Sequence, residues 1–243
     1  MNKQTLMGFI NRFYLGGQTQ SAPVKSTKDT LSCAFINSAK SCVGDIVLAK
    51  NGIGDYEMGL YEIQDLIKLI SVLDGDMDVD VKTVGEVASQ LVLSQKNTKA
   101  RINYGLARLD VVQKKPDLSN VPEFTLELKL DKKFISTFIS GKSALSEVAT
   151  FAVLADGKEA KVVIGYSSTT QSNKVTIPVE CGKVDSFEEA VLFDADTFKE
   201  ILLANRDCES STLYISDKGL AKVNFKVDNF DSTYILVAKT TVD

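Results

Sequence analysis

Hydrophobic residues recur along the chain with two periods, one typical of helices and one typical of strands. Leu6, Phe9, Ile10 and Phe13 have the i, i+3, i+4, i+7 spacing of an amphipathic helix, and three further helices are predicted at 61–73, 134–140 and 193–206. The alternating or short apolar runs between them predict strands. These lie at 31–36, 43–49, 55–62, 79–84, 90–94 and 99–107 in the first half, and at 123–130, 148–155, 160–166, 174–180, 188–193, 211–216, 220–227 and 232–238 in the second.

The order helix, strands, helix, strands occurs twice. Residues 61–70 match 193–202 in residue class at a constant offset of 132. Chance repetition of a common α+β pattern is the alternative, and the constant offset argues against it. The pattern therefore predicts an α+β protein of two similar domains, each with two helices packed on antiparallel sheet.

The segment from Leu109 to Glu123, LDVVQKKPDLSNVPE, separates the two repeats. Pro116 and Pro122 each lack an amide donor and push the preceding residue toward extended backbone, so neither a helix nor an interior strand is favoured. We therefore predict an N-terminal domain at 1–108, a connector at 109–122 and a C-terminal domain at 123–243.

Composition narrows the functional classes. Hydrophobic residues make up 44% of the 243 residues and charged residues 25%, with a net charge of -4 and no histidine. The absence of histidine excludes Ser-His-Asp and Cys-His nucleophile systems and the H-E-x-x-H metal site. No glycine-rich phosphate loop occurs, the four cysteines are scattered, and Asp194 and Asp196 are explained as acids at a helix N-terminus. We expect an intracellular protein that is not an enzyme and has no metal or other cofactor.

Two local patterns join the duplication to a known family. One runs from YEIQDL at 61–66 through LDGDM at 73–77 to KARI at 99–102, and the other is AKVNFK at 221–226 followed by YILVA at 234–238. With the connector, they resemble the sliding clamps, the DNA polymerase processivity factors, and within them the two-domain phage type with the proliferating cell nuclear antigen fold.

The resemblance implies a homotrimeric ring around duplex DNA that tethers the replicative DNA polymerase during phage DNA replication. It also implies a clamp-loader ATPase as partner, no membrane association, and a place in the cytoplasm of an infected bacterial cell. The ring would hold DNA topologically, so its helices need only a weakly attractive basic lining.

The resemblance implies three sets of site residues. The DNA-facing set is Lys3, Arg12, Lys68, Lys132, Lys133, Lys142, Lys199 and Arg206. The set for binding partner peptides is Val111, Val112, Pro116, Leu118, Ile235, Val237 and Ala238, and the set for subunit contacts is Arg101, Ile102, Asn103, Tyr104, Val175, Thr176 and Ile177.

Simpler interpretations of these residues, and one alternative function, remain open. Asp65, Asp131 and Glu200 lie among the basic residues, as on an ordinary solvated helix face, and the peptide-binding residues could instead close the interdomain core. A non-ring viral structural or assembly protein with duplicated β-rich domains is the alternative function, although basic residues spread over four helices favour a lined hole.

One feature departs from the clamp pattern. Clamp domains begin with a strand before the first helix, but the first half opens directly with its helix. That strand is either missing or supplied by residues 22–27, and the polar stretch at 18–30 has no assigned role.

Overall fold

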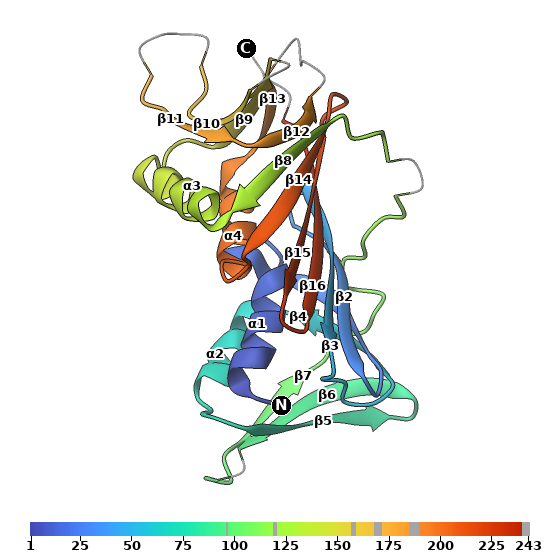
Figure 1. Ribbon diagram of the computed structural model, residues 1–243. Coiled ribbons are helices and arrows are strands. Elements are labelled where there is room, and N and C mark those ends of the chain that lie inside the picture. The colour runs from blue at the N-terminus through green and yellow to red at the C-terminus, as the bar shows by residue number, and fades with distance from the viewer. Residues whose placement is uncertain (96, 119–120, 157–158, 168–171, 185–189, 240–243) are drawn as a thin grey trace. The chain divides into compact units, whose positions relative to one another are not determined.

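The computed structural model describes residues 1–95, 97–118, 121–156, 159–167, 172–184 and 190–239. The chain forms two compact units (Figure 1). The first comprises Met1–Pro116 together with Asp228–Ser232, and the second comprises Asp117–Val227 together with Thr233–Asp243. The division after Pro116 falls inside the segment predicted to be a connector.

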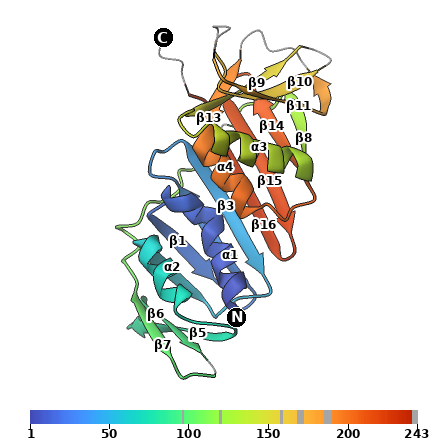
Figure 2. The same ribbon diagram turned by 90° about the vertical axis from the view of Figure 1, so that its left-hand side faces the viewer.

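The first unit contains two helices and seven strands in its described residues. In chain order they are α1 (Lys3–Tyr14), a 3-10 turn η1 (Leu15–Gly17), β1 (Ser21–Ser26), β2 (Thr30–Ile36), β3 (Cys42–Ala49), β4 (Tyr56–Tyr61), α2 (Ile63–Ser71), β5 (Met77–Val84), β6 (Val87–Gln95) and β7 (Arg101–Gly105). One antiparallel sheet has the order β3-β2-β1-β4 and the other has the order β5-β6-β7. Figure 2 shows α1 and α2 side by side in front of β1 and β3.

The second unit repeats this plan. Its elements are β8 (Leu126–Asp131), α3 (Lys132–Ala144), β9 (Thr150–Ala155), β10 (Ala160–Ile164), β11 (Val175–Val179), β12 (Cys181–Val184), β13 (Val191–Asp194), α4 (Ala195–Ala204), β14 (Ser210–Ser216), β15 (Leu220–Val227) and β16 (Phe230–Val237). One sheet has the order β11-β10-β9-β13, and β12, β8, β14 and β15 are neighbours in the other. Helices α3 and α4 pack against each other (Figure 2).

The predicted α+β class and the two similar helix-and-sheet domains are confirmed. Helix α2 begins at Ile63 and α4 at Ala195, which are 132 residues apart as the sequence offset requires. A strand leads directly into each of these helices, β4 into α2 and β13 into α4. The predicted strand at 188–193 is seen from Val191, while its first two residues, 188 and 189, lie outside the described residues.

Aromatic side chains fill the cores beneath the helices. In the second unit Phe138 meets Phe151 and Phe198 with ring centroids 5.2 and 4.9 Å apart, and all three are completely buried. In the first unit Phe9 and Phe13 of α1 pack edge to face at 5.3 Å. Edge-to-face packing suits the quadrupoles of the rings and adds to the free energy gained by burying their apolar area.

Of the two alternatives for the strand before α1, the one in which residues 22–27 supply it is wrong. They fall largely within β1, which pairs with β2 and β4 as β9 pairs with β10 and β13. Met1 and Asn2 lie at the place of the strand before α1, since Asn2 bridges Asp76 and Met77 N–H donates to the Met1 carbonyl at 2.9 Å. The corresponding strand β8 pairs with β14 over six residues.

The polar stretch at 18–30 thus contains a buried strand that the hydrophobic pattern did not indicate. Its inward positions include Ser21 and Ser26, which are 7% and 2% exposed. Their hydroxyls have partners, because Ser21 Oγ accepts from Gln113 N–H at 3.3 Å and Ser26 Oγ accepts from Ile53 N–H at 3.1 Å. Hydrogen bonding lets these polar side chains take core positions.

Two further elements differ from the predictions. Strand β12 was not predicted, and α3 continues past Gly141 to Ala144. Glycine is tolerated there because the helix runs close beneath β11: a Cβ on Gly141 would lie 3.1 Å from Val175 Cγ1.

The connector has no helix or strand in its described residues, as predicted. Its first part is tied to the first unit. Val112 is 5% exposed, Gln113 N–H donates to Ser21, and Lys115 forms an ion pair with Asp45. Gly59 of β4 makes this close approach possible, because a Cβ there would lie 2.4 Å from the Ala107 carbonyl oxygen and 3.3 Å from Val112 Cγ1.

We therefore expect Gly59→Ala to lower the free energy of unfolding by about 1–3 kcal/mol, as overpacking does in close-packed interiors. Gly105→Ala is the matched control, because no atom lies within 4 Å of a Cβ built on that strand glycine. It should change stability by no more than about 0.5 kcal/mol. Urea unfolding measures both, and equal effects of the two substitutions would contradict the close approach at Gly59.

Candidate nucleic-acid and subunit interfaces

The eight basic residues predicted to face DNA occupy three kinds of environment. Two are buried, three are exposed or half-buried and held by partners, and three form no hydrogen bond or ion pair in the described part of the chain. These differences decide which of them can meet a ligand.

Arg12 and Lys142 are buried, so their predicted contact with DNA is contradicted. The Arg12 guanidinium stacks over the Phe230 ring at 3.8 Å and donates to the Gly8 carbonyl at 2.8 Å, all within the first unit. Lys142 is 2% exposed, and its Nζ lies 2.8 Å from a carboxylate oxygen of Asp196. Both side chains use their charge inside the fold.

Lys3, Lys68 and Lys132 have local partners. Lys3 Nζ donates to the carbonyls of Ser71 and Leu73 and thereby ties α1 to the end of α2. Lys68 pairs with Asp65 at 2.9 Å one turn earlier, and Lys132 pairs with Glu209. The Lys68 and Lys132 pairs are exposed, and exposed pairs of this kind contribute roughly 0–1 kcal/mol, so another anion can displace them at little cost.

Lys133, Lys199 and Arg206 have no hydrogen bond or ion pair among the described residues. Lys133 and Arg206 are exposed and Lys199 is half-buried. Lys133 comes from the start of α3, Lys199 from the middle of α4 and Arg206 from the turn after α4, so all three lie on or just after two packed helices. These three of the eight predicted residues are therefore best placed to meet a polyanion in solution.

Two carboxylates near these helices have shifted pKa values. Burial raises the pKa of Asp194, but hydrogen bonds from Lys239 and from the amide and hydroxyl of Thr197 outweigh it, and the net effect is a lowered pKa. Asp194 caps α4 and is 2.6 Å from Lys239 Nζ. Burial raises the pKa of Glu200; the nearby Lys199 lowers it and Asp196 raises it, and the net shift is upward.

Strand β7 has a free edge. In the part of the chain that the structure describes it pairs with β6 alone, and the hydrogen bond from Gln95 N–H to the Ala100 carbonyl sets which residues face inward. By alternation, Arg101, Asn103 and Gly105 direct their amide and carbonyl groups away from β6. The Ile102 and Tyr104 side chains are buried, and burial raises the pKa of Tyr104, whose hydroxyl contacts the Tyr61 backbone. Of the predicted contact residues here, the backbone edge and the exposed side chains Arg101 and Asn103 are available.

Strand β11 has the second free edge, and its chemistry is asymmetric. Among the described residues it pairs with β10 alone, and the carbonyl of Glu180, just beyond its end, points outward and accepts from Lys129 N–H at 2.9 Å. By alternation, the backbone groups of Thr176 and Pro178 therefore point away from β10. Pro178 has no amide hydrogen, so Thr176 supplies the outward N–H within the strand. A proline in a predicted strand indicates an edge position, a signal that our prediction of this strand did not use.

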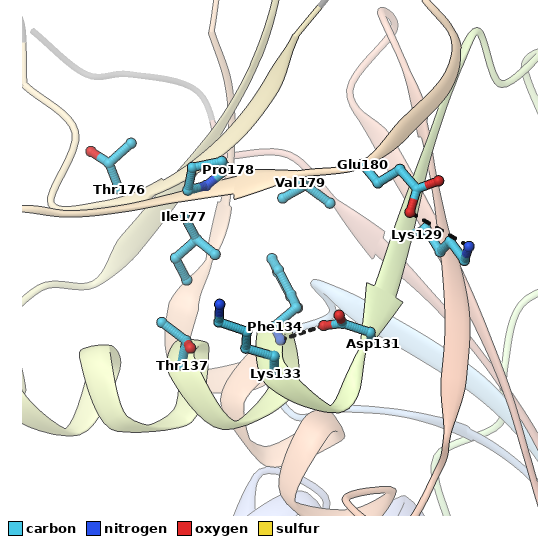
Figure 3. A pocket seen from close by; sticks show the side chains of 10 residues that line it. All are labelled: Lys129, Asp131, Lys133, Phe134, Thr137, Thr176, Ile177, Pro178, Val179 and Glu180. Atoms are coloured by element: carbon cyan, nitrogen blue, oxygen red, sulfur yellow. Dashed lines mark hydrogen bonds and ion pairs between the residues drawn. The ribbon is translucent and has the colours of Figure 1, made fainter.

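A hollow of about 510 Å³ lies between the β11 edge and the start of α3 (Figure 3). Ile177 points from β11 toward the helix, while Lys133 and Thr137 rise from α3 (Figure 3). Asp131 caps the helix by accepting from Phe134 N–H at 2.7 Å, and Lys129 and Glu180 pair at 3.5 Å. The hollow thus has one apolar wall and a rim that carries both positively and negatively charged side chains.

The predicted peptide-binding residues are divided between the two units. In the first unit Val111 is 62% exposed and Pro116 is exposed, but Val112 is buried against Gly59, which contradicts its predicted role. In the second unit Leu118 and Val237 are exposed, and Ile235 and Ala238 are half-buried. The Ala238 N–H donates to the Gly219 carbonyl at 2.8 Å, which fixes the end of the last strand.

Among the described residues no three His, Cys, Asp or Glu side chains are grouped so as to hold a metal ion. The cysteines are free thiols, and burial, followed by the charge of Asp45, raises the pKa of Cys33 well above its usual value. In the described part of the chain, no helix has the length and apolar character needed to cross a membrane.

Comparison with known proteins identifies the fold. No family model matches the chain, and no curated protein matches it. Among solved structures, the crystal structure of proliferating cellular nuclear antigen from Entamoeba histolytica matches with a TM-score of 0.76, covering 99% of this chain and 97% of that chain. Sequence identity is 10%, so the match establishes the fold. The predicted resemblance to the proliferating cell nuclear antigen fold is confirmed.

Proposed function

We propose that this protein is a sliding clamp, a non-enzymatic DNA polymerase processivity factor that encircles duplex DNA. The observation that carries the proposal is the match over nearly the whole of both chains to a nuclear antigen of that fold. Two strand edges that are unpaired in the described residues support it from the chain itself, as do three cations, on or just after the packed helices α3 and α4, that form no ion pair there.

Ring closure is proposed through the two edges. Strand β7 of one copy would add to β11 of the next, so that Asn103 and Thr176 exchange backbone hydrogen bonds. This contact is heterologous, because different surfaces of the two copies meet, and such contacts generate rings when the rotation closes. Three two-domain copies would complete the ring, as in the phage-type clamps that the sequence resembles.

DNA is proposed to pass along the helices. Lys133, Lys199 and Arg206 would contact phosphates without reading bases, and Lys68 and Lys132 would join them by exchanging their exposed carboxylate partners. Lys3 is proposed as a weaker contributor, because backbone carbonyls hold its ammonium. Few cations suit a sliding protein, since strong phosphate binding would slow its movement.

Partner binding is proposed for the exposed apolar residues of the connector and the last strand. Val111, Pro116, Leu118 and Val237 would receive the apolar anchors of short peptides, with Ile235 and Ala238 beside them. The partners proposed are a replicative polymerase and a clamp-loader ATPase, in phage DNA replication in the cytoplasm of an infected bacterium.

The proposed edge pairing predicts that Asn103→Pro abolishes assembly. Proline removes the outward amide donor of β7 at a position whose inward pairing with β6 is carried by the neighbouring residues. Asn103→Ala is the matched control, because it shortens the side chain and keeps the amide. Sedimentation velocity should give a trimer for the native chain and Asn103→Ala and a monomer for Asn103→Pro. Equal assembly of all three would contradict this interface.

The proposed lining predicts that the triple variant Lys133→Glu, Lys199→Glu, Arg206→Glu weakens binding to duplex DNA at least tenfold. Losing three phosphate contacts should also reduce the slope of log K against log salt by roughly 3. The charge-matched control replaces Lys50, Lys82 and Lys161 with glutamate. These three lysines lie on strands or in a turn. Fluorescence anisotropy with a labelled duplex measures both variants. An equal loss in the control would mean that only net charge matters.

A further inference from the structure

A second groove lies in the first unit, apart from the residues assigned above. Its volume is about 880 Å³, and its walls are the start of β4, the β5–β6 turn and the residues that follow β7. Its position within one unit means that a single copy of the chain contains the complete groove.

The β5–β6 turn presents two unusually exposed valines to this groove. Val84 and Val87 are 74% and 60% exposed, and they are directly opposite each other in the β5–β6 pairing. Opposite residues of an antiparallel pair project from the same face, so the two side chains form one apolar step. Ala88 next to them is buried and belongs to the lining of the groove.

The opposite wall has unpaired backbone. Strand β4 is the last strand of its sheet, and on its outer side Gly59 accepts a hydrogen bond from Ala107 N–H at 2.9 Å. Glu57 lies two residues earlier, so alternation directs its N–H and C=O to the same outer side. The residues after Ala107 form no further bridge to β4 in the described part of the chain. The ladder begun at Gly59 thus stops where the groove begins.

The charge of the groove is strongly acidic. Four carboxylates line it, and Arg108 is the cation among the lining residues. Arg108 is already paired with Asp110 at 2.9 Å, and Glu57 has only a distant exposed contact with Lys25 at 3.8 Å. Asp55 and Glu86 have no cation partner among the described residues. A ligand with positive charge would relieve this repulsion.

We infer that this groove binds an extended peptide in which basic and apolar residues alternate. Its backbone would add to the outer edge of β4 beside Glu57 and continue the ladder begun by Ala107. Its apolar side chains would pack on Val84 and Val87, and its lysines or arginines would meet Asp55, Glu57 and Glu86. Strand addition supplies affinity through main-chain hydrogen bonds, and the alternating side chains supply specificity. The inference does not depend on ring formation or on DNA binding.

The test uses the full-length chain and a fluorescein-labelled peptide of about ten residues in which lysine alternates with valine, a length that spans one strand. Anisotropy titration at low salt should show saturable binding that weakens as salt screens the charges. The same peptide with glutamate for lysine should not bind. A third peptide, methylated on alternate backbone amides, should bind at least tenfold more weakly, because it cannot complete the ladder.

Variants of the protein then locate the site. Glu57→Lys with Glu86→Lys should weaken binding of the lysine peptide at least tenfold, and Val84→Thr with Val87→Thr should weaken it while keeping the branched strand residues. The charge-matched control is Asp80→Lys with Glu147→Lys, at exposed positions outside the groove. Unchanged thermal unfolding would show that the variants are folded.

Three results would overturn the inference. The first is absence of saturable binding, and the second is equal binding of the amide-methylated peptide. The third is a native self-association that the Glu57 and Glu86 variant abolishes, since the occupant would then be a second copy of this chain. Loss of assembly in Asn103→Pro with peptide binding retained would separate this groove from the proposed subunit interface.

Discussion

The unpaired edges of two strands are the constraint from which the proposed assembly of this protein follows. Backbone N–H and C=O groups at the edge of a sheet attract further strands, and natural proteins cover or interrupt such edges. Here β7 and β11 end their sheets, one in each unit, with outward groups at Asn103 and Thr176. Pro178 removes one donor from the β11 edge, which limits indiscriminate pairing while leaving room for one specific neighbour. A head-to-tail ring would satisfy both edges at once.

The basic side chains are divided between the interior of the fold and the helix surfaces. Arg12 and Lys142 are used inside the fold, where stacking on Phe230 and pairing with Asp196 satisfy them. The helices are left with few unpartnered cations on a chain of net charge -4. A protein that held DNA by charge would need more cations on its helices, whereas a protein that encloses DNA would need only these few cations. The connector is likewise fixed at its first part, by Val112 and Lys115, and exposes Val111 beside them.

Much of the fold could be predicted because the hydrophobic periodicity and the 132-residue offset are both visible in the sequence. Strand β1 could not be placed from its pattern, and residues 22–27 were considered only as a strand before α1. Ser21 and Ser26 occupy core positions because residues distant in sequence satisfy their hydroxyls. Arg12 and Lys142 were misassigned for a related reason: long side chains bury their stems, and the sequence does not show which partner will meet the charge. The edge strands were predicted as strands, and the resemblance assigned both to subunit contacts. Which of their backbone groups face outward, and the acidic groove beside β4, depend on pairing between distant segments.

Topological enclosure of DNA is the central claim, and a linear duplex with ends that can be blocked tests it most directly. The protein is allowed to thread onto a biotinylated duplex, streptavidin then caps both ends, and the salt concentration is raised to about 1 M, where the Debye length is about 3 Å and electrostatic binding is lost. The account predicts that capped DNA retains the protein and that cutting the duplex releases it. Equal loss from capped and uncapped DNA would contradict enclosure.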